Sequence, residues 1–325
     1  MPSVTILVAV YNAAPFLPYC LQSLQRQTFR DIQIICIDDA STDNSPEIIN
    51  EYAKHDTRIV PVFLDENHGQ AYARNIGLQK AKGDIICMVD ADDWISSDAL
   101  ELLVAAFDDQ TDCVLFEVVK VFDNDTQELY ALPPFETLTG KEAFRLSLTW
   151  KIHGIYGIRA HIHRLYPYDD SCRTYSDDNT TRLHYLSSRQ VRCCKGIYYY
   201  RQRSNSVTHQ ISVRRFDYLR ATESMHRQMK DHSIDRQLLH LYENQRWLIL
   251  VGVYMFYHVH GHQLSDEDRK FGLQELRRCW QLIDRHALTS ETTHKFGYYP
   301  CCCWTFFRIQ EWIYFTLRGF LGKNI

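Results

Sequence analysis

The sequence predicts an α/β protein whose mostly parallel sheet is flanked by helices and followed by a helical C-terminal region. In residues 1–122, apolar runs rich in β-branched residues alternate with segments of helical spacing, which is the pattern of repeated βαβ units. In residues 211–325, apolar residues recur with a helical period instead. The 325 residues are 45% hydrophobic and 23% charged, so the composition is that of a globular protein rather than a disordered or fibrous one.

Five mostly apolar runs predict the strands of the sheet. Because these runs are nearly continuous rather than alternating, they are typical of parallel strands that are covered on both faces. Ligands bind beyond the carboxyl ends of such strands, so we expect the functional residues there. The predicted strands are Val4–Val10, Ile32–Ile37, Ile59–Leu64, Asp84–Val89 and Cys113–Val121.

Helices are predicted between these strands, at Phe16–Gln27, Ser45–Tyr52, Gln70–Lys82 and Ser97–Phe107. Ser45 is expected to cap the second helix, because a serine hydroxyl accepts a free backbone N–H and Pro46 suits a first helical turn. Gly83 is expected to stop the third helix. The polar segment Asp123–Thr139, which contains two prolines, predicts a connecting loop.

Charge, cysteine content and hydropathy exclude several classes of protein. A formal charge of −4 disfavours nucleic acid as the main partner. The eleven cysteines include no Cys-x-x-Cys pair, so we expect neither a disulfide framework nor a structural zinc site. His161 and His163 could share one face of a strand, but such histidines are more often structural than zinc ligands. The longest apolar run, Trp247–Tyr257, is about half as long as a membrane-spanning helix and predicts a buried core helix.

Paired carboxylates follow two of the predicted strands. Asp38 and Asp39 end the second strand, and the sequence Asp90-Ala91-Asp92-Asp93 follows the fourth. Because both strand ends should lie at one edge of the sheet, these carboxylates could hold Mg²⁺ or Mn²⁺ together with substrate phosphates. The alternative is that they are solvated turn residues or helix caps.

Four motifs resemble those of the family 2 glycosyltransferases, which have the GT-A fold, a Rossmann-like arrangement that binds nucleotide sugars. The resemblance is dense over residues 3–120 and thinner to residue 210, and its motifs are Val4–Asn12, Ile37–Asp43, Asn67–Gly77 and Gly83–Asp93. It implies a catalytic domain over residues 1–210, with a nucleotide-binding half at 1–122 and an acceptor half at 123–210. Residues 211–325 would form the helical C-terminal region.

The resemblance implies a role for each residue at the strand ends. Asp39 resembles the carboxylate that accepts the N3–H of uracil, with Tyr11 packing on the base and Val10 supplying backbone contacts. Asp90 is similar to the residue near the ribose. Asp92 is similar to the carboxylate that binds the cation bridging the diphosphate, where the cation offsets charge on the departing nucleoside diphosphate.

Arginines are expected near the anionic part of the donor. Arg74, which follows a glycine near the start of a helix, could contact uracil or phosphate, and the alternative is a surface helix arginine. Arg201 and Arg203 would share one face of a strand, and either could contact the diphosphate. Alternatively, they pair with the acids at the sheet edge.

Inverting glycosyl transfer needs a base that takes the proton from the acceptor hydroxyl. The family usually supplies it from a Glu-Asp pair ahead of a helix, and the resemblance puts it at Asp177, with Asp178 as the alternative. The sequence departs from the family in having Ser176 where Glu is common. The competing interpretation is that Asp177 only caps the following helix.

The resemblance therefore implies an inverting glycosyltransferase that moves a sugar, from an expected UDP-linked donor, to a glycan or lipid-linked acceptor in bacterial envelope or exopolysaccharide synthesis. Its setting would be the cytoplasm or the inner face of the plasma membrane. Trp304–Arg318 is aromatic and basic, which suits either a membrane interface or packing on the catalytic domain. The rivals are an inactive nucleotide-sugar-binding protein and a nucleotidyltransferase, although no glycine-rich basic loop follows Val10.

Overall fold

The computed structural model describes residues 3–172, 175, 177–202 and 211–322. The chain forms two compact units, the first made of residues 1–173 and 180–204 and the second of residues 174–179 and 205–325. The α/β fold class with a helical C-terminal region is confirmed. The domain division at residue 210 stays a prediction.

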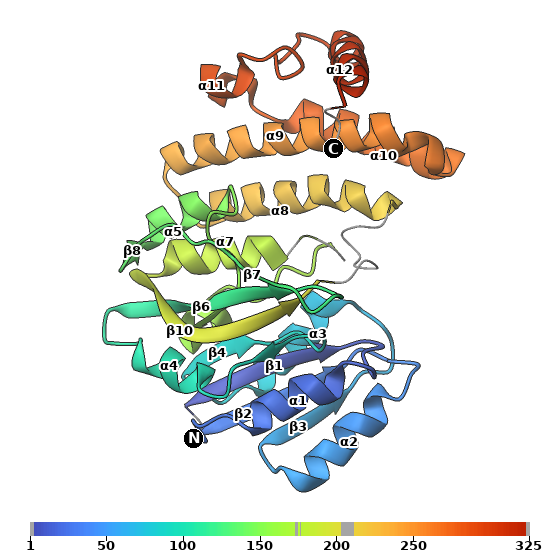
Figure 1. The fold of residues 1–325 in the computed structure, drawn as a ribbon. Helices are drawn as coiled ribbons and strands as arrows, with labels where there is room; N and C mark the ends of the chain where they lie inside the picture. Colours follow the sequence, from blue (N-terminus) through green and yellow to red (C-terminus); the bar gives the residue numbers. More distant parts are fainter. Residues whose placement is uncertain (1–2, 173–174, 176, 203–210, 323–325) are drawn as a thin grey trace. The chain divides into compact units, whose positions relative to one another are not determined.

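The first unit is built on a sheet with strand order β3-β2-β1-β4-β9-β6-β10-β5, and Figure 1 shows the helices of this unit lying against it. Two short strands lie off this path, since β7 pairs with β6 and β8 pairs with β10. The strands are β1 (Val4–Val10), β2 (Ile32–Asp38), β3 (Ile59–Phe63), β4 (Ile85–Met88), β5 (Trp94–Ile95), β6 (Thr111–Val121), β7 (Gln127–Leu129), β8 (Leu138–Thr139), β9 (Tyr156–Arg159) and β10 (Gln190–Arg201).

The part of the sheet formed by the first four strands of the chain is parallel, as the sequence predicts. β1 pairs in parallel with both β2 and β4, and β2 pairs in parallel with β3. The antiparallel strand β9 then lies between β4 and β6. No sequence pattern indicated this insertion, because β9 comes about seventy residues after β4 along the chain and has only four residues.

Apolar layers cover both faces of the sheet. Along β1, Val4, Ile6, Val8 and Val10 pack on the face covered by α1, α2 and α4, whereas Leu7 packs on the opposite face with α3 and α6. This alternation is the two-residue period of a strand buried on both faces. The helices of this unit are α1 (Leu17–Gln25), α2 (Ser45–His55), α3 (Gln70–Lys80), α4 (Ala99–Ala105), α5 (Gly140–Ser147) and α6 (Ala160–Leu165); α7 (Asp177–Ser187) starts in the second unit and continues in the first.

Gly83 does not stop the third helix as predicted, because α3 ends at Lys80 and its C-cap is Ala81.

Three other local predictions were wrong. Ser45 is the first residue of α2 rather than its cap, and its hydroxyl accepts from the backbone N–H of Ala13 instead (3.0 Å). The predicted loop Asp123–Thr139 contains β7 and β8. His161 and His163 lie on the helix α6, not on a strand, so residues two apart do not share a face.

The second unit is helical, with an aromatic core that joins α8, α9, α10 and α12. The predicted core helix at Trp247–Tyr257 lies within α9, and Trp247 and Leu250 are fully buried, so that prediction is confirmed. Across the residues described, no helix has the length and apolar character to cross a bilayer. The helices of this unit are α8 (Asp217–Asp231), α9 (Arg236–His260), α10 (Asp266–Leu282), α11 (Ser290–Thr293) and α12 (Trp304–Phe320).

Candidate active site

The carboxyl ends of β1, β2 and β4 meet at one edge of the sheet. In the register of these strands Val10 faces Asp38, and Leu7 faces Met88. The carbonyl of Val10 accepts a hydrogen bond from the backbone N–H of Asp39 (2.8 Å), which ties the two strand ends together. We call Tyr11, Asp39, Asp90 and Asp92 the strand-end site, because each lies on a segment that leaves this edge. We include Arg74 of α3, because its side chain binds Asp90.

The loop after β1 is held by the loop after β2. The backbone N–H of Asn12 donates to the hydroxyl of Ser41 (3.0 Å), and the Asn12 side-chain oxygen accepts from the backbone N–H of Thr42 (2.8 Å). Asn12 adopts a left-handed conformation (φ 50°), which asparagine tolerates better than most residues. These bonds fix the turn beside Tyr11, whose side chain is 53% exposed, so an aromatic face remains open at the site.

Asp39 anchors the loop that leads into α3. Its buried carboxylate accepts from the backbone N–H groups of His68 (2.9 Å) and Gly69 (2.8 Å) and from the Asn67 side-chain amide (3.0 Å). Gly69 has φ +94°, a conformation that favours glycine. This structural role was not foreseen from the sequence, and the role of Asp39 in base recognition stays a prediction.

Arg74 is buried and binds Asp90. The guanidinium Nη2 donates to Oδ1 of Asp90 (2.6 Å), and the side-chain amide of Gln70 donates to the same oxygen (3.0 Å). Only 1% of Arg74 is exposed, so the alternative of a surface arginine is wrong. The ring of Tyr168 lies 5.2 Å from the guanidinium carbon and completes its surroundings. Arg74 and Asp90 therefore come together as one unit.

A buried pair of histidines lies behind Tyr168. The His163 ring centroid is 4.7 Å from that of Tyr168 and 4.5 Å from that of His184. Burial lowers the pKa of His184 to about 4 and lowers the pKa of His163 well below its ordinary value. Both rings are therefore neutral near pH 7, as expected for a packed support.

Asp93 connects the acidic turn to β10. Its carboxylate accepts from the hydroxyl of Tyr198 (2.8 Å) and from the backbone N–H of Arg201 (2.8 Å). Burial raises the pKa of the Asp93 carboxyl well above its ordinary value, and the negative charges of Asp90 and Asp92 raise it further. The sequence places Asp93 in the acidic motif but gives no sign of this contact, because Tyr198 lies 105 residues away.

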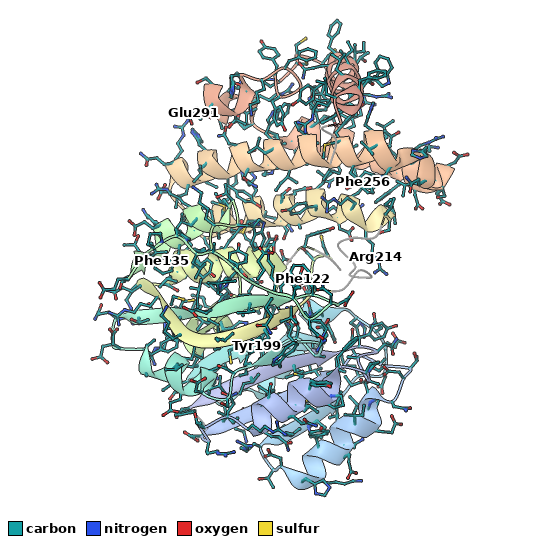
Figure 2. All side chains as sticks on the ribbon, viewed as in Figure 1. Phe122, Phe135, Tyr199, Arg214, Phe256 and Glu291 are labelled. Carbon is teal, nitrogen blue, oxygen red and sulfur yellow. The ribbon has the colours of Figure 1, made fainter. Side chains whose placement is uncertain are left out.

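Arg201 is the predicted diphosphate contact that the structure describes, and Arg203 lies outside the described residues. The Arg201 Nε donates to the backbone carbonyl of Asp92 (3.0 Å), so this arginine reaches the acidic turn. Its guanidinium carbon lies 4.8 Å from the centroid of the Trp94 ring. Trp94 is in turn stacked on Tyr199, which Figure 2 labels on β10, with the centroids 5.2 Å apart.

The predicted base lies in the first turn of α7, within the second unit. Asp177 is the first residue of that helix, and its Oδ1 accepts from the backbone N–H of Asp178 (3.2 Å). Next along the helix, the Asn179 side chain donates to the carbonyl of Ala221 on α8 (2.8 Å). Ser176 lies outside the described residues. The catalytic role of Asp177, or of Asp178, stays a prediction.

The described residues contain no cluster of three or more His, Cys, Asp or Glu side chains arranged to enclose a metal ion. A site for Mg²⁺ or Mn²⁺ does not need one, since such ions are usually held by one or two carboxylates plus substrate phosphates. The strand-end site has two carboxylates of this kind, since Asp90 and Asp92 lie two residues apart on the turn that follows β4.

The fold and the polar strand ends together define an α/β protein of the nucleotide-binding class. Residues 5–165 match the family model "Glycosyl transferase family 2", and the chain belongs to this family, as its motifs indicated.

Curated relatives match over parts of their length. EpsH of Bacillus subtilis is 41% identical over 142 residues, which are 42% of this chain and 41% of EpsH. The uncharacterized glycosyltransferase EpsJ of Bacillus subtilis is 32% identical over 64% of this chain and 63% of its own length. A poly(ribitol-phosphate) beta-glucosyltransferase of Bacillus spizizenii is 42% identical over 30% of this chain and 16% of its own length. The chain thus spans less than two thirds of each.

Solved structures share the fold across almost the whole chain. TarS 1–349 of S. aureus superposes with a TM-score of 0.74 at 17% identity and covers 99% of this chain and 92% of its own. The same TarS fragment in complex with UDP-GlcNAc gives a TM-score of 0.70 at 18% identity, with 99% and 93% covered. The mannosyltransferase PcManGT of Pyrobaculum calidifontis, in complex with GDP-Man and Mn²⁺, gives 0.52 at 17% identity, with 99% and 88% covered.

Proposed function

We propose that this protein transfers a sugar from a UDP-linked donor to an acceptor hydroxyl, with inversion at the anomeric carbon. The observation that carries the proposal is the strand-end site. It combines an exposed aromatic ring at Tyr11, an ion pair between the buried Arg74 and the partly exposed Asp90, and a carboxylate at Asp92 on a turn that Asp93 anchors to β10. This site lies where open α/β sheets bind nucleotides.

The nucleotide would bind across the ends of β1 and β2. Tyr11 would stack on the base, with the Val10 backbone beside it, and Asp39 would accept the N3–H of uracil. A carboxylate has about four lone-pair positions, so Asp39 retains acceptor capacity beyond the three bonds it makes to the 67–69 loop. The UDP-GlcNAc complex of TarS supports the choice of a UDP-linked donor.

Asp92 would hold Mg²⁺ or Mn²⁺ against the donor diphosphate, and Asp90 would lie near the ribose. The bound cation would neutralise charge on the departing nucleoside diphosphate. Arg74 fixes Asp90 by a charged hydrogen bond of 2.6 Å, so the acid is oriented before the donor arrives. Arg201 would add positive charge beside the diphosphate. The PcManGT complex with Mn²⁺ supports the cation.

Asp177 would take the proton from the acceptor hydroxyl as that oxygen attacks the anomeric carbon, with Asp178 as the alternative base. The acceptor would be a glycan or a lipid-linked glycan of the bacterial envelope or an exopolysaccharide. The similarity to a poly(ribitol-phosphate) beta-glucosyltransferase supports such a polymer. The reaction would occur in the cytoplasm, at the inner face of the plasma membrane.

A thermal-shift screen of the purified protein tests the donor class. The protein is melted with UDP, GDP, CMP or dTDP, each with and without Mn²⁺, because a ligand of the native state raises the melting temperature by mass action. We expect stabilisation by UDP that requires Mn²⁺. Stabilisation by another nucleotide alone would reassign the donor, and no response to any nucleotide would contradict the proposed function.

Binding and turnover are separated by incubating the protein with UDP-sugars and Mn²⁺ and measuring released UDP, with and without a crude acceptor glycan. Release that rises with the acceptor is the expected result. Binding of UDP without any release would instead identify an inactive nucleotide-sugar-binding protein.

A further inference from the structure

The helix α12 has two apolar faces, and only one of them is covered. Phe307 and Phe315 are buried against the core of the second unit, where Phe307 contacts Trp247 on α9 with ring centroids 5.5 Å apart. The other face, which we call the α12 apolar face, carries large side chains that are exposed by 37 to 85%. They are Phe306, Ile309, Trp312, Ile313, Leu317 and Phe320.

The spacing of these residues makes a continuous stripe. Five of the six recur at intervals of three or four residues, which places them along one side of a helix, and Trp312 lies beside Ile313. Single exposed apolar residues are normal on a protein surface, but a contiguous stripe of this kind marks an interaction site. Trp312 is 60% exposed and Phe320 is 85% exposed.

An exposed arginine lies beside the stripe. In residues 292–322 the basic side chains are Lys295, Arg308 and Arg318, and the only carboxylate is Glu311. Arg318 lies two helical turns after Glu311, on the covered side of α12, and its guanidinium donates to the hydroxyl of Tyr314 (3.2 Å). Glu311 is fully buried on the opposite side of α12, and burial raises its pKa to about 8, so it adds little negative charge at neutral pH. Arg308 is exposed beside the stripe. The surface is therefore complementary to an anionic partner that also accepts apolar groups.

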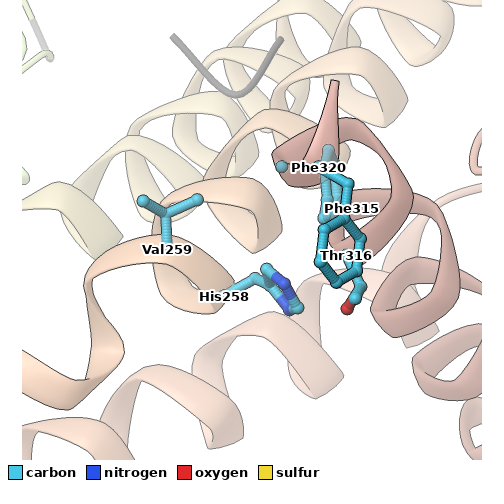
Figure 3. Close-up of a pocket in the computed structure, with 6 residues that line it drawn as sticks. His258, Val259, Phe315, Thr316 and Phe320 are labelled. Atoms are coloured by element: carbon cyan, nitrogen blue, oxygen red, sulfur yellow. The ribbon is translucent and has the colours of Figure 1, made fainter. Parts of the chain in front are cut away.

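A pocket lies along the same helix. It has a volume of about 410 Å³ and is lined by residues of α9 and α12, including Phe315 and the stripe residue Phe320. Figure 3 shows the imidazole of His258 directed toward Phe315 and Thr316, and the ring centroids of His258 and Phe315 are 6.0 Å apart. A cavity lined partly by apolar side chains therefore lies next to the exposed stripe, and it is open to an apolar group of a bound partner.

We propose that the α12 apolar face binds the surface of an anionic phospholipid bilayer, with the helix lying in the plane of the interface. Trp, Phe and Leu on one side of a helix with a basic residue at the border is the composition of helices that lie in the headgroup region. Arg308 contacts lipid phosphates, and the aromatic side chains insert among the upper acyl carbons. This binding is independent of the strand-end site and does not require the nucleotide.

Co-sedimentation with vesicles tests the proposal. The full chain is mixed with vesicles of phosphatidylcholine alone or phosphatidylcholine with phosphatidylglycerol, and the bound fraction is measured at low and high salt. We expect binding to the anionic vesicles that weakens as salt screens the charges. Trp312→Ser combined with Leu317→Ser should weaken vesicle binding by about a hundredfold or more, because two inserted side chains are lost.

The matched control is Tyr19→Ser combined with Leu165→Ser, which removes two side chains of similar exposure, 65% and 64%, from the first unit. The control should bind vesicles like the unaltered protein, and both double variants should keep its circular dichroism and its response to UDP. Absence of binding to anionic vesicles, or equal binding by the two double variants, would overturn the proposal. Dimerisation lost only in the α12 variant, without lipid binding, would overturn it in favour of a second copy of the chain.

Discussion

The strand-end site and the α12 apolar face depart in opposite ways from the usual distribution of residues, in which apolar groups are buried and polar groups are exposed. At the first, polar groups such as Arg74 and Asp39 are buried and held by hydrogen bonds. At the second, large apolar groups such as Trp312 and Phe320 are exposed. Buried polar groups and contiguous exposed apolar surface are both costly for a folded chain. At the strand-end site hydrogen bonds within the fold offset this cost, whereas at the α12 apolar face a bound partner would offset it.

The largest expected effect concerns the proposed base at the start of α7. Asp177→Asn should lower sugar transfer by about 10²- to 10⁴-fold, because a general base is lost, while UDP binding is retained. Transfer is measured as acceptor-dependent release of UDP. The matched control is Asp178→Asn, which should remain active. Normal turnover by Asp177→Asn with loss in Asp178→Asn would move the base by one residue, and normal turnover by both would remove it from α7.

The next effect concerns Asp93, the buried carboxylate that follows Asp92 of the strand-end site. Asp93→Ala leaves the Tyr198 hydroxyl and the Arg201 backbone N–H without their acceptor, which should lower the free energy of unfolding by about 2–4 kcal/mol. Asp93→Asn should lower the free energy of unfolding by less, because its amide oxygen still accepts a hydrogen bond. Denaturant unfolding measures both. Asp84→Ala, an exposed acid at the other end of β4, serves as the control and should change stability little. Equal losses in Asp84→Ala and Asp93→Ala would contradict the anchoring role.

A smaller effect, on UDP affinity, is expected when the exposed ring of Tyr11 is removed from the strand-end site. Tyr11→Ala should weaken UDP binding by roughly tenfold, since a base stacked on an aromatic side chain gains about 1–3 kcal/mol. Tyr11→Phe should bind UDP normally, because the ring is kept. Tyr19→Ala, on α1 and also exposed, is the control for loss of a surface tyrosine. Isothermal calorimetry gives the affinities, and unchanged binding by Tyr11→Ala would separate Tyr11 from the base.

A further effect lies in the second unit and appears only at alkaline pH. The pKa of Glu311 rises from 4.5 to about 8 on burial, so its contribution to stability is complete below about pH 4.5 and is lost as the pH rises through 8. Glu311→Gln keeps an oxygen that can accept from Gln310 but removes the titration. The variant should therefore melt a few degrees higher than the parent protein at about pH 8.5 and similarly at about pH 5.

Glu291→Gln provides the control for the pH experiment, because Glu291 is exposed on the short helix α11. Its melting temperature should follow that of the parent protein at every pH. A Glu311→Gln variant with the same pH profile as the parent would show that the buried carboxyl does not titrate in this range.

The sequence predicted those features that are encoded by neighbouring residues. The apolar runs located β1, β2 and β4, and the acids directly after them located the strand-end site, because strand direction alone brings those ends together. The sequence did not indicate contacts between residues that are far apart along the chain. Asp39 accepts from residues 28 to 30 positions away, and the burial of Arg74 depends on Tyr168, so neither environment follows from a local motif. The helix at α12 was foreseeable, but which of its faces is covered depends on α9.

The central claim is that the carboxylate of Asp92 holds a cation against a bound uridine diphosphate. Calorimetric titration of UDP into the protein, with Mn²⁺ and with a chelator, tests it in the parent protein, Asp92→Ala and the control Asp84→Ala. We predict Mn²⁺-dependent binding that weakens by about a hundredfold in Asp92→Ala and is unchanged in Asp84→Ala. Binding of UDP that is equally tight in Asp92→Ala, with the same dependence on Mn²⁺, would contradict the claim.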